Sequence, residues 1–147
     1  MRSWLIAGFT LLLDRLAKAF VVAHLHPGQS APLLPPLLHL TYVQNIGAAF
    51  GLFKGQQLLF IVISIAVIGW ISRELLLRPP AQAMIGRAYG LILGGAAGNL
   101  IDRVRLGYVI DFLDLRVWPV FNVGDSAITI GVALLIWHAL QGRGNAS

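Results

Sequence analysis

Four long apolar stretches constrain the fold of this chain more than any other feature. Each is close to the roughly 20 residues that an α-helix needs to cross a bilayer. They cover about residues 4–22, 57–75, 84–103 and 123–140. The chain is 57% hydrophobic and only 12% charged, and segments 58–72 and 126–137 offer no polar face to water. We therefore expect an all-α integral membrane protein in which residues 1–147 form a single domain with four transmembrane helices.

The segments between the apolar stretches predict a small cap on the helical bundle. Residues 24–56 and 104–122 would form two external segments on the same side of the membrane. The first contains four prolines, which interrupt helices, and its residues 38–44 are rich in strand-forming side chains. We expect a β-containing extramembrane cap in the first external segment.

Basic residues predict the orientation of the four spans. An even number of spans places both termini on one side of the membrane, together with five arginines. Four basic residues would lie opposite, and three of these have acidic neighbours that can pair with them. Because basic residues favour the cytoplasmic side, we expect both termini in the cytoplasm.

The net charge of +5 does not indicate nucleic-acid binding, because the basic residues are spread singly along the edges of the apolar stretches. Membrane lipids are the expected partners. The absence of cysteine excludes disulfides and thiol catalysis. The four histidines lack the spacing of metal ligands, so we expect no metal site.

Four of the six acidic residues lie in the last third of the chain: Asp102, Asp111, Asp114 and Asp125. Charges near hydrocarbon are costly, so they usually mark a functional site. Asp111 follows the third span and Asp125 opens the fourth, and antiparallel neighbouring helices would bring them together. Two close carboxyl groups share a proton near neutral pH. One could then activate a water while the other protonates a carbonyl oxygen, as in aspartic proteases.

The spacing of the acids alone leaves other functions open. Intramembrane carboxylates also form relays for protons or cations, and Asp102, Asp111 and Asp125 could serve as one. Ion pairing with nearby arginines is a structural alternative. A non-catalytic scaffold assembled through glycines is a third, because Gly90 and Gly94 begin a stripe of small residues that favours close helix approach.

Two further patterns place polar residues within the spans. Asp14 and Lys18 lie four residues apart, so they face the same side of a helix and can form an ion pair. The glycine stripe continues through Gly98, and one more step of four residues reaches Asp102, with Asn99 beside it. The face that packs tightest against a neighbouring helix would therefore also carry a carboxylate.

Five ordered sequence blocks resemble lipoprotein signal peptidase (signal peptidase II), the bacterial inner-membrane aspartyl peptidase family. The blocks are Asp14-x-x-x-Lys18, Asn45-x-Gly47-x-Ala49-Phe50, Gly94-Gly95-x-x-Gly98-Asn99-x-x-Asp102-Arg103, Val109-x-Asp111-Phe112 and Phe121-Asn122-x-x-Asp125-x-x-Ile128. Each block alone is a weak signal, but together and in order they cover nearly the whole chain.

The resemblance implies a catalytic dyad of Asp111 and Asp125, in agreement with the argument from spacing. It also implies that a set of polar and small residues supports the site or binds substrate. These are Asp14, Lys18, Asn45, Gly47, Asn99, Asp102, Arg103 and Asn122. No metal or organic cofactor is implied.

The implied activity is removal of the signal peptide from prolipoproteins that already carry diacylglycerol, by cleavage before the lipidated cysteine. We expect a monomer in the bacterial inner membrane, with its active site near the outer face, where the scissile bond lies at headgroup level. Residues 45–50 could clamp the substrate, because glycine and alanine permit close backbone approach. Arg116 or Lys54 could hold a lipid phosphate.

The chain departs from the family pattern at three positions. Gly124 replaces the usual alanine, and Arg15 and Ala17 replace glutamine and serine or threonine near Lys18. None of these changes affects the dyad, but the polar surroundings of Lys18 do not follow from the family.

Overall fold

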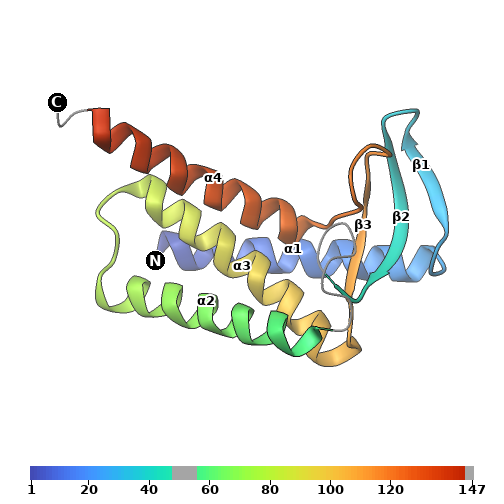
Figure 1. Cartoon of the computed structure of the whole chain (residues 1–147), viewed down its shortest axis with the longest axis horizontal. Helices are drawn as coiled ribbons and strands as arrows, with labels where there is room; N and C mark the ends of the chain where they lie inside the picture. Colours follow the sequence, from blue (N-terminus) through green and yellow to red (C-terminus); the bar gives the residue numbers. More distant parts are fainter. Residues whose placement is uncertain (48–55, 145–147) are drawn as a thin grey trace.

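The computed structural model of this chain describes residues 1–47 and 56–144, and side chains as far as residue 141. Seven elements follow one another: α1 (Arg2–His24), β1 (Ser30–Leu34), β2 (Leu38–Asn45), α2 (Gln57–Leu77), α3 (Ala83–Leu106), β3 (Val109–Asp114) and α4 (Val123–Gly144). The predictions for Ala49, Phe50 and Lys54 fall outside the described residues. Figure 1 shows the helices running alongside one another, with the sheet at one end of the bundle and the N-terminus at the other.

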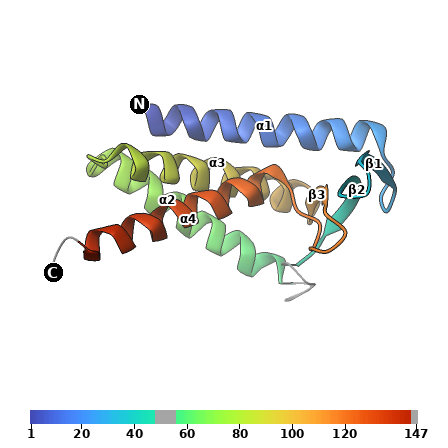
Figure 2. The same cartoon turned by 90° about the horizontal axis from the view of Figure 1, so that it is seen from above.

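Helix α3 contacts each of the other three helices. Figure 2 shows it directly beside α1, with α2 and α4 on its other side. The glycine stripe explains this close contact, as predicted. A Cβ atom at Gly90 would lie 2.6 Å from the carbonyl oxygen of Ser3, and one at Gly94 would lie 2.5 Å from that of Ala7. Small residues therefore allow the α1 and α3 backbones to approach each other closely.

Apolar side chains cover the outside of the bundle. Among the described helices, α2 and residues 123–141 of α4 are long and apolar enough to cross a membrane. Their large side chains face outward, with Leu58 at 74% and Leu140 at 61% exposure. Helices α1 and α3 do not meet the same criterion, and each carries three charged residues in its second half. Most of these charges point inward.

The sheet is larger than the predicted cap. It has the order β1-β2-β3 and both pairings are antiparallel. The strand predicted over residues 38–44 is confirmed as β2, but β1 and β3 were not predicted. The cap predicted in the first external segment is present as β1 and β2, but the sheet also includes β3 from the second external segment, which places Asp111 opposite Val43.

Two apolar clusters hold these parts together. One lies inside the bundle and includes Ile71, Ile92 and Leu93. The other joins α1 to the sheet through Val21 and Tyr42 with residues of β3. Because β3 has neighbours on both faces, five of its six residues are buried. The strand is therefore held in a fixed position between the end of the bundle and the rest of the sheet.

Candidate active site

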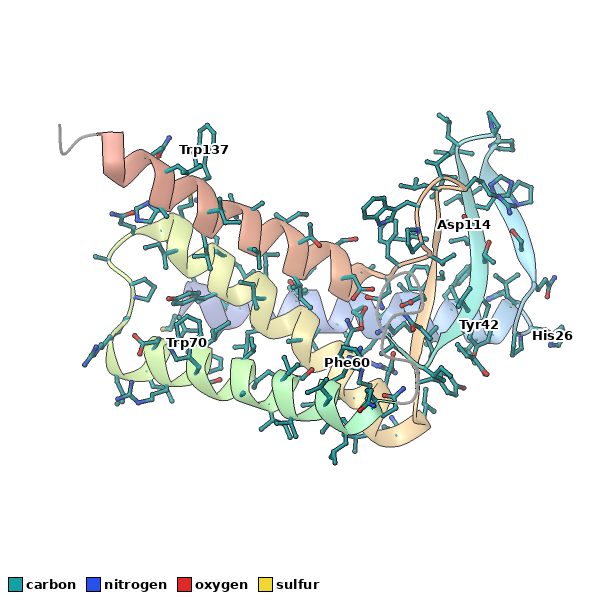
Figure 3. The ribbon with its side chains drawn as sticks, viewed as in Figure 1. His26, Tyr42, Phe60, Trp70, Asp114 and Trp137 are labelled. Carbon is teal, nitrogen blue, oxygen red and sulfur yellow. The ribbon has the colours of Figure 1, made fainter. Side chains whose placement is uncertain are left out.

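A cavity of about 650 Å³ lies where the sheet meets the ends of α2, α3 and α4. Asp111 enters it from β3 and Asp125 from the first turn of α4. Phe60 of α2 and Arg103 of α3 also line it, and Figure 3 shows Phe60 at the end of α2 that faces the sheet. The prediction that Asp111 and Asp125 lie together near one end of the bundle is therefore met by the geometry.

Amide groups hold both carboxyl groups of this pair. Asn45 donates to Asp111 Oδ2 at 2.8 Å, and Asn122 Nδ2 donates to Asp111 Oδ1 at 2.7 Å. Asn99 donates to Asp125 Oδ1 at 2.8 Å, and the Asn122 backbone N–H donates to Asp125 Oδ2 at 3.2 Å. All four carboxylate oxygens thus accept a hydrogen bond from an uncharged group.

Asn122 fixes the two carboxyl groups relative to each other. Its side chain donates to Asp111, while its Oδ1 accepts the backbone N–H of Asp125 at 2.8 Å. This second bond caps the start of α4, where backbone N–H groups otherwise lack partners. One residue therefore both begins the helix that carries Asp125 and orients the strand residue Asp111.

Burial, the larger cause, and the nearby negative charge of Asp125 together raise the pKa of Asp111 from its ordinary value to about 7. The hydrogen bonds from Asn45 and Asn122 oppose this rise, as does the more distant charge of Lys18. Two carboxyl groups in this arrangement hold one proton between them near neutral pH. The pair titrates as a unit, so the proton belongs to the pair rather than to one residue.

A second polar cluster lies beneath the cavity, between α1 and α3. Lys18 Nζ lies 2.9 Å from Asp14 Oδ2 and 2.8 Å from Asp102 Oδ2, and all three side chains are fully buried. Lys18 also donates to Asn99 Oδ1 at 2.9 Å. Since Asn99 donates to Asp125, this cluster is joined directly to the pair in the cavity.

The same cluster fixes the neighbouring backbone. Asp14 Oδ1 accepts the N–H of Gly124 at 2.9 Å, and Asp102 Oδ2 accepts the N–H of Ile110 at 3.2 Å. A Cβ atom at Gly98 would collide with the Asp14 carboxylate. Asp14 and Asp102 therefore position the start of α4 and the strand β3, which carry the two cavity aspartates.

The remaining predicted residues also lie at the site. Gly47 lines the cavity and donates its N–H to Asn45 Oδ1 at 2.9 Å. Arg103 lines the cavity with its guanidinium 5.0 Å from the centre of the Phe60 ring. The Arg103 Nε atom is buried and has no hydrogen-bond partner among the described residues. A polar group of a bound molecule could satisfy that donor.

Two of the four clustered acids do not line the cavity. Asp102 belongs to the cluster beneath it, and Asp114 lies in the sheet. Asp114 accepts hydrogen bonds from Thr41 and from the Arg116 backbone. The Arg116 side chain donates to Ser30 Oγ at 3.1 Å and lies 3.5 Å from the Asp114 carboxylate; its binding of a lipid phosphate stays a prediction.

Arg15 was not predicted as part of the polar network. It pairs with Asp102 across the interface between α1 and α3. Only the helix-to-helix contact reveals this pair, because the two residues are 87 positions apart. Arg15 thus links α1 to α3 within this network.

Within the described part of the chain, no three His, Asp or Glu side chains gather as they would around a metal ion. The cavity instead offers two carboxyl groups, a guanidinium and an apolar wall. The wall includes Leu115, Val120, Ile128 and Ile130. This arrangement suits acid–base chemistry on an apolar molecule with a polar reacting group.

The chain is similar to known proteins over almost its whole length. The model of the family described as signal peptidase (SPase) II matches residues 6–141. A lipoprotein signal peptidase of Halothermothrix orenii is 45% identical over 138 residues, which are 94% of each chain. One of Bacillus velezensis is 41% identical over 148 residues, covering 98% of this chain and 97% of that protein.

A solved bacterial membrane enzyme, determined by the in meso method at 2.3 Å, has the same fold. Its TM-score is 0.93 at 33% identity, and the match covers 99% of this chain and 92% of that one. The residues matched by the family model, 6–141, include the cavity pair and the cluster beneath it. This chain belongs to the signal peptidase II family of membrane aspartic peptidases.

Proposed function

We propose that this protein removes the signal peptide from diacylglyceryl-modified prolipoproteins, with Asp111 and Asp125 as its catalytic dyad. Cleavage falls immediately before the lipidated cysteine. The observation that carries the proposal is the pair of carboxyl groups in one cavity, held by amides and joined by Asn122. With the pKa of Asp111 near 7, the pair can hold one proton at working pH.

The chemistry follows from one shared proton. The ionised carboxylate removes a proton from a water as its oxygen attacks the scissile carbonyl carbon. The protonated carboxyl donates its proton to the carbonyl oxygen, which gives a neutral tetrahedral intermediate. Collapse of that intermediate breaks the C–N bond: one hydroxyl of the intermediate returns its proton to the ionised member of the dyad, and the departing amine nitrogen takes up the proton that the other member had removed from the water. Asn45, Asn99 and Asn122 contribute by holding both carboxyl groups in position.

The cavity suits a lipid-modified peptide. Its wall is largely apolar and its residues come from the ends of the helices and from the loop before α4. The solvent-exposed Trp118, at 58%, lines the same cavity. Lipid chains of the substrate would remain in the bilayer while the scissile bond enters between the helices and the sheet. Gly47 and the buried donor of Arg103 would face the substrate backbone.

Four membrane crossings and cytoplasmic termini complete the proposal. The apolar outer faces of α2 and α4 support it, and so does the inward direction of the charges of α1 and α3. The N-terminus and the turn between α2 and α3 lie at the end of the bundle away from the sheet (Figure 1). This orientation puts the cavity near the outer face of the inner membrane and the dyad at headgroup level.

The decisive experiment uses three aspartates of the same protein. Purified wild type, Asp111→Asn, Asp125→Asn and Asp114→Asn are each given a diacylglyceryl-modified prolipoprotein in detergent, and cleavage is followed by the mass shift. We expect both dyad variants to lose activity by a factor on the order of 10⁴, the upper end for acid–base groups. Asp114→Asn is the matched control, because its carboxylate lies in the same strand but outside the cavity.

The results for the variants test the dyad roles of Asp111 and Asp125, and the result for wild type tests the peptidase activity. Cleavage that persists in a folded Asp111→Asn or Asp125→Asn variant would remove that residue from the dyad. Absence of cleavage by folded wild type would remove the peptidase proposal and favour a proton-relay function, which proton flux in proteoliposomes would then test.

A further inference from the structure

The two carboxyl groups in the cavity accept the same number of hydrogen bonds, but the groups behind their donors differ. Asp111 lies on a strand and accepts from the side-chain amides of Asn45 and Asn122. Asp125 lies in the first turn of α4 and accepts from the amide of Asn99 and from the backbone N–H of Asn122. The pair binds one proton as a unit, and these surroundings decide which carboxyl carries that proton for most of the time.

The start of α4 favours a negative charge on Asp125. Asn122 precedes the helix and accepts the Asp125 N–H at 2.8 Å, while Asp125 Oδ2 accepts the Asn122 N–H at 3.2 Å. These reciprocal bonds form a capping box, in which a side chain three residues after the cap satisfies a free N–H group. The N-terminus of a helix also carries a partial positive charge. Asp111 lies on β3 instead, and strands have only a small net dipole.

A cation lies behind the other donor to Asp125. Lys18 Nζ donates to Asn99 Oδ1 at 2.9 Å, and Asn99 Nδ2 donates to Asp125 Oδ1 at 2.8 Å. An ammonium group can only donate, so it fixes the Asn99 amide with its oxygen toward Lys18 and its N–H group toward Asp125. Hydrogen bonds in such a chain strengthen one another. The positive charge of Lys18 therefore acts on Asp125 through a single amide.

The donors to Asp111 have neutral groups behind them. The Oδ1 atom of Asn45 accepts the N–H of Gly47 at 2.9 Å, and that of Asn122 accepts the N–H of Asp125 at 2.8 Å. Both amides are thereby oriented as donors, but by backbone groups and not by an ammonium. Burial and the charge of Asp125 raise the pKa of Asp111 to about 7, which agrees with a carboxyl that keeps its proton near neutral pH.

The other charged groups near the pair also act on Asp125 more than on Asp111. Among the described residues that line the cavity, Arg103 is the only basic one, and it interacts more strongly with Asp125 than with Asp111. Outside the cavity, the charged groups that ion pairs or hydrogen bonds join to this network are Lys18, Asp14, Asp102 and Arg15. Two cations and two carboxylates balance there, and Lys18 is the member that contacts Asn99.

We propose that Asp125 is the ionised base of the dyad and that Asp111 carries the proton, an assignment that rests on the proposed peptidase function. Lys18 and Asn99 are positioning residues that set this division. Asp125 removes a proton from the water as the water oxygen bonds to the scissile carbon, and Asp111 gives its proton to the carbonyl oxygen. When the intermediate collapses, a hydroxyl proton returns to Asp111 and the amine takes its proton from Asp125. The attacking water then lies on the side of α4, and the carbonyl oxygen on the side of β3.

Two matched substitutions each remove one amide donor from one carboxyl. Asn99→Ala removes the 2.8 Å bond to Asp125, and Asn45→Ala removes the 2.8 Å bond to Asp111. The pH profile of kcat/KM reports both ionisations of the free enzyme. Its acid limb follows formation of the base, and its alkaline limb follows loss of the shared proton. We expect Asn99→Ala to move the acid limb up by about one pH unit, because the base has lost a donor to its charged form. Asn45→Ala should move the alkaline limb up by about the same amount.

The limb that moves decides the assignment, whatever activity the variants retain. If Asn99→Ala moved the alkaline limb and Asn45→Ala the acid limb, the roles of the two aspartates would be reversed. Equal movement of both limbs in both variants would mean that neither carboxyl is preferred. A lower kcat with both limbs in place would leave Asn99 a structural residue only, and would also reject the proposal.

A second measurement needs neither a variant nor a substrate. All but one of the six acidic residues are aspartates, so labelling aspartate with ¹³C at Cγ gives few carboxyl signals, and these can be assigned through their bonds to the backbone. In wild type in detergent at about pH 6, below the Asp111 pKa of about 7, we expect the Asp111 signal at the protonated position and the Asp125 signal at the ionised one. Asp114 is the internal reference for an ionised carboxylate, because the hydrogen bond from Thr41 lowers its pKa.

The NMR result and the cleavage result can fail separately. A protonated Asp125 beside an ionised Asp111, or an equal share of the proton, would overturn the assignment even if the protein cleaves prolipoproteins. Absence of cleavage by folded wild type would remove the peptidase function while the measured position of the proton still stood.

Discussion

Two pairs of aspartates lie at the same end of the bundle, and they differ in the groups that hold them. Asp14 and Asp102 are held by Lys18 and Arg15, so two carboxylates face two cations. Asp111 and Asp125 are held by the amides of three asparagines and by one backbone N–H. Both members of the second pair line the cavity of about 650 Å³, whereas neither Asp14 nor Asp102 does.

The difference in these partner groups distinguishes a pair of carboxylates that positions the backbone from a pair that can take part in a reaction. A buried carboxylate paired with a cation stays charged and serves as a fixed acceptor for backbone N–H groups. Asp111 has no such ion-pair partner among the described residues, so burial and the neighbouring charge of Asp125 raise its pKa even though the amide hydrogen bonds oppose the rise. Asn99 and Lys18 connect the two pairs, so each depends on the other's geometry. The contrast between the pairs can be tested by substitution.

Removal of the cation should have the largest effect on stability. Lys18→Met leaves Asp14 and part of Asp102 as buried charges without compensation. We expect the free energy of unfolding in detergent to fall by about 3–5 kcal/mol, the usual cost of breaking a buried ion pair. A second variant, with Asp14→Asn added to Lys18→Met, should recover part of that loss.

Arg73→Met is the matched control for the loss of the Lys18 charge. Arg73 is an exposed residue, paired with Glu74 at 3.1 Å, and its loss should cost less than about 1 kcal/mol. If Lys18→Met were as stable as wild type, the cation would not be what balances the first pair of aspartates.

The pH dependence of stability should distinguish the second pair. The pKa of Asp111 is about 7 in the folded protein, above its ordinary value of 3.8. Below both values the proton is bound in the folded and unfolded states, and the stabilising contribution is fully present. As pH rises toward 7, the unfolded chain has released the proton while the folded protein retains it, so stability falls by about 1.4 kcal/mol per pH unit.

Unfolding of wild type and Asp111→Asn in detergent between pH 5.5 and 7 measures this difference. The wild type should lose about 2 kcal/mol over that range relative to the variant, because the asparagine does not titrate. Parallel curves for the two proteins would mean that Asp111 does not carry the proton of the pair.

The smallest expected effect on stability concerns Asp114, whose surroundings differ from those of both pairs. The hydrogen bond from Thr41 is the main cause that lowers its pKa, aided by the N–H and charge of Arg116. A lowered pKa stabilises the fold above the unfolded value, and that contribution is lost as pH falls through the folded value. Thr41→Val should therefore cost about 1 kcal/mol at pH 7 and less at pH 3.

Ser30→Ala is the control for Thr41→Val. Ser30 lies 2.8 Å from the Thr41 hydroxyl at an exposed position, and its removal leaves the bond from Thr41 to Asp114 in place. An equal loss of stability in the two variants, at both pH values, would show that the Asp114 carboxylate is not the acceptor that matters.

The helices were predictable from sequence because each long apolar stretch is a local signal. The Asp14–Lys18 pair was predictable for the same reason, since four residues correspond to one helical turn. The glycine stripe correctly predicted the close approach of α3 to a neighbour, although not which neighbour. Arg15 was missed because its partner, Asp102, lies on another helix and 87 positions away.

The strand β3 shows why part of the sheet was not predicted. Val109–Asp114 contains two aspartates among apolar residues, a pattern that a loop can share. Its strand form depends on pairing with β2, from the other external segment. The position of Asp111 opposite Val43 follows from that non-local pairing. The sequence therefore predicted that Asp111 and Asp125 lie close together, but not the strand that carries Asp111.

The ion pair within α1 also bears on how the chain enters its membrane. Asp14 and Lys18 lie on one helix, so α1 neutralises much of its own charge before any other helix has been synthesised. Asp102 has no such partner on α3, because its cations are Lys18 and Arg15 of α1. The ribosome completes α1 long before α3 emerges. We therefore expect the first helix to act as a template, against which the third inserts with its carboxylate already matched.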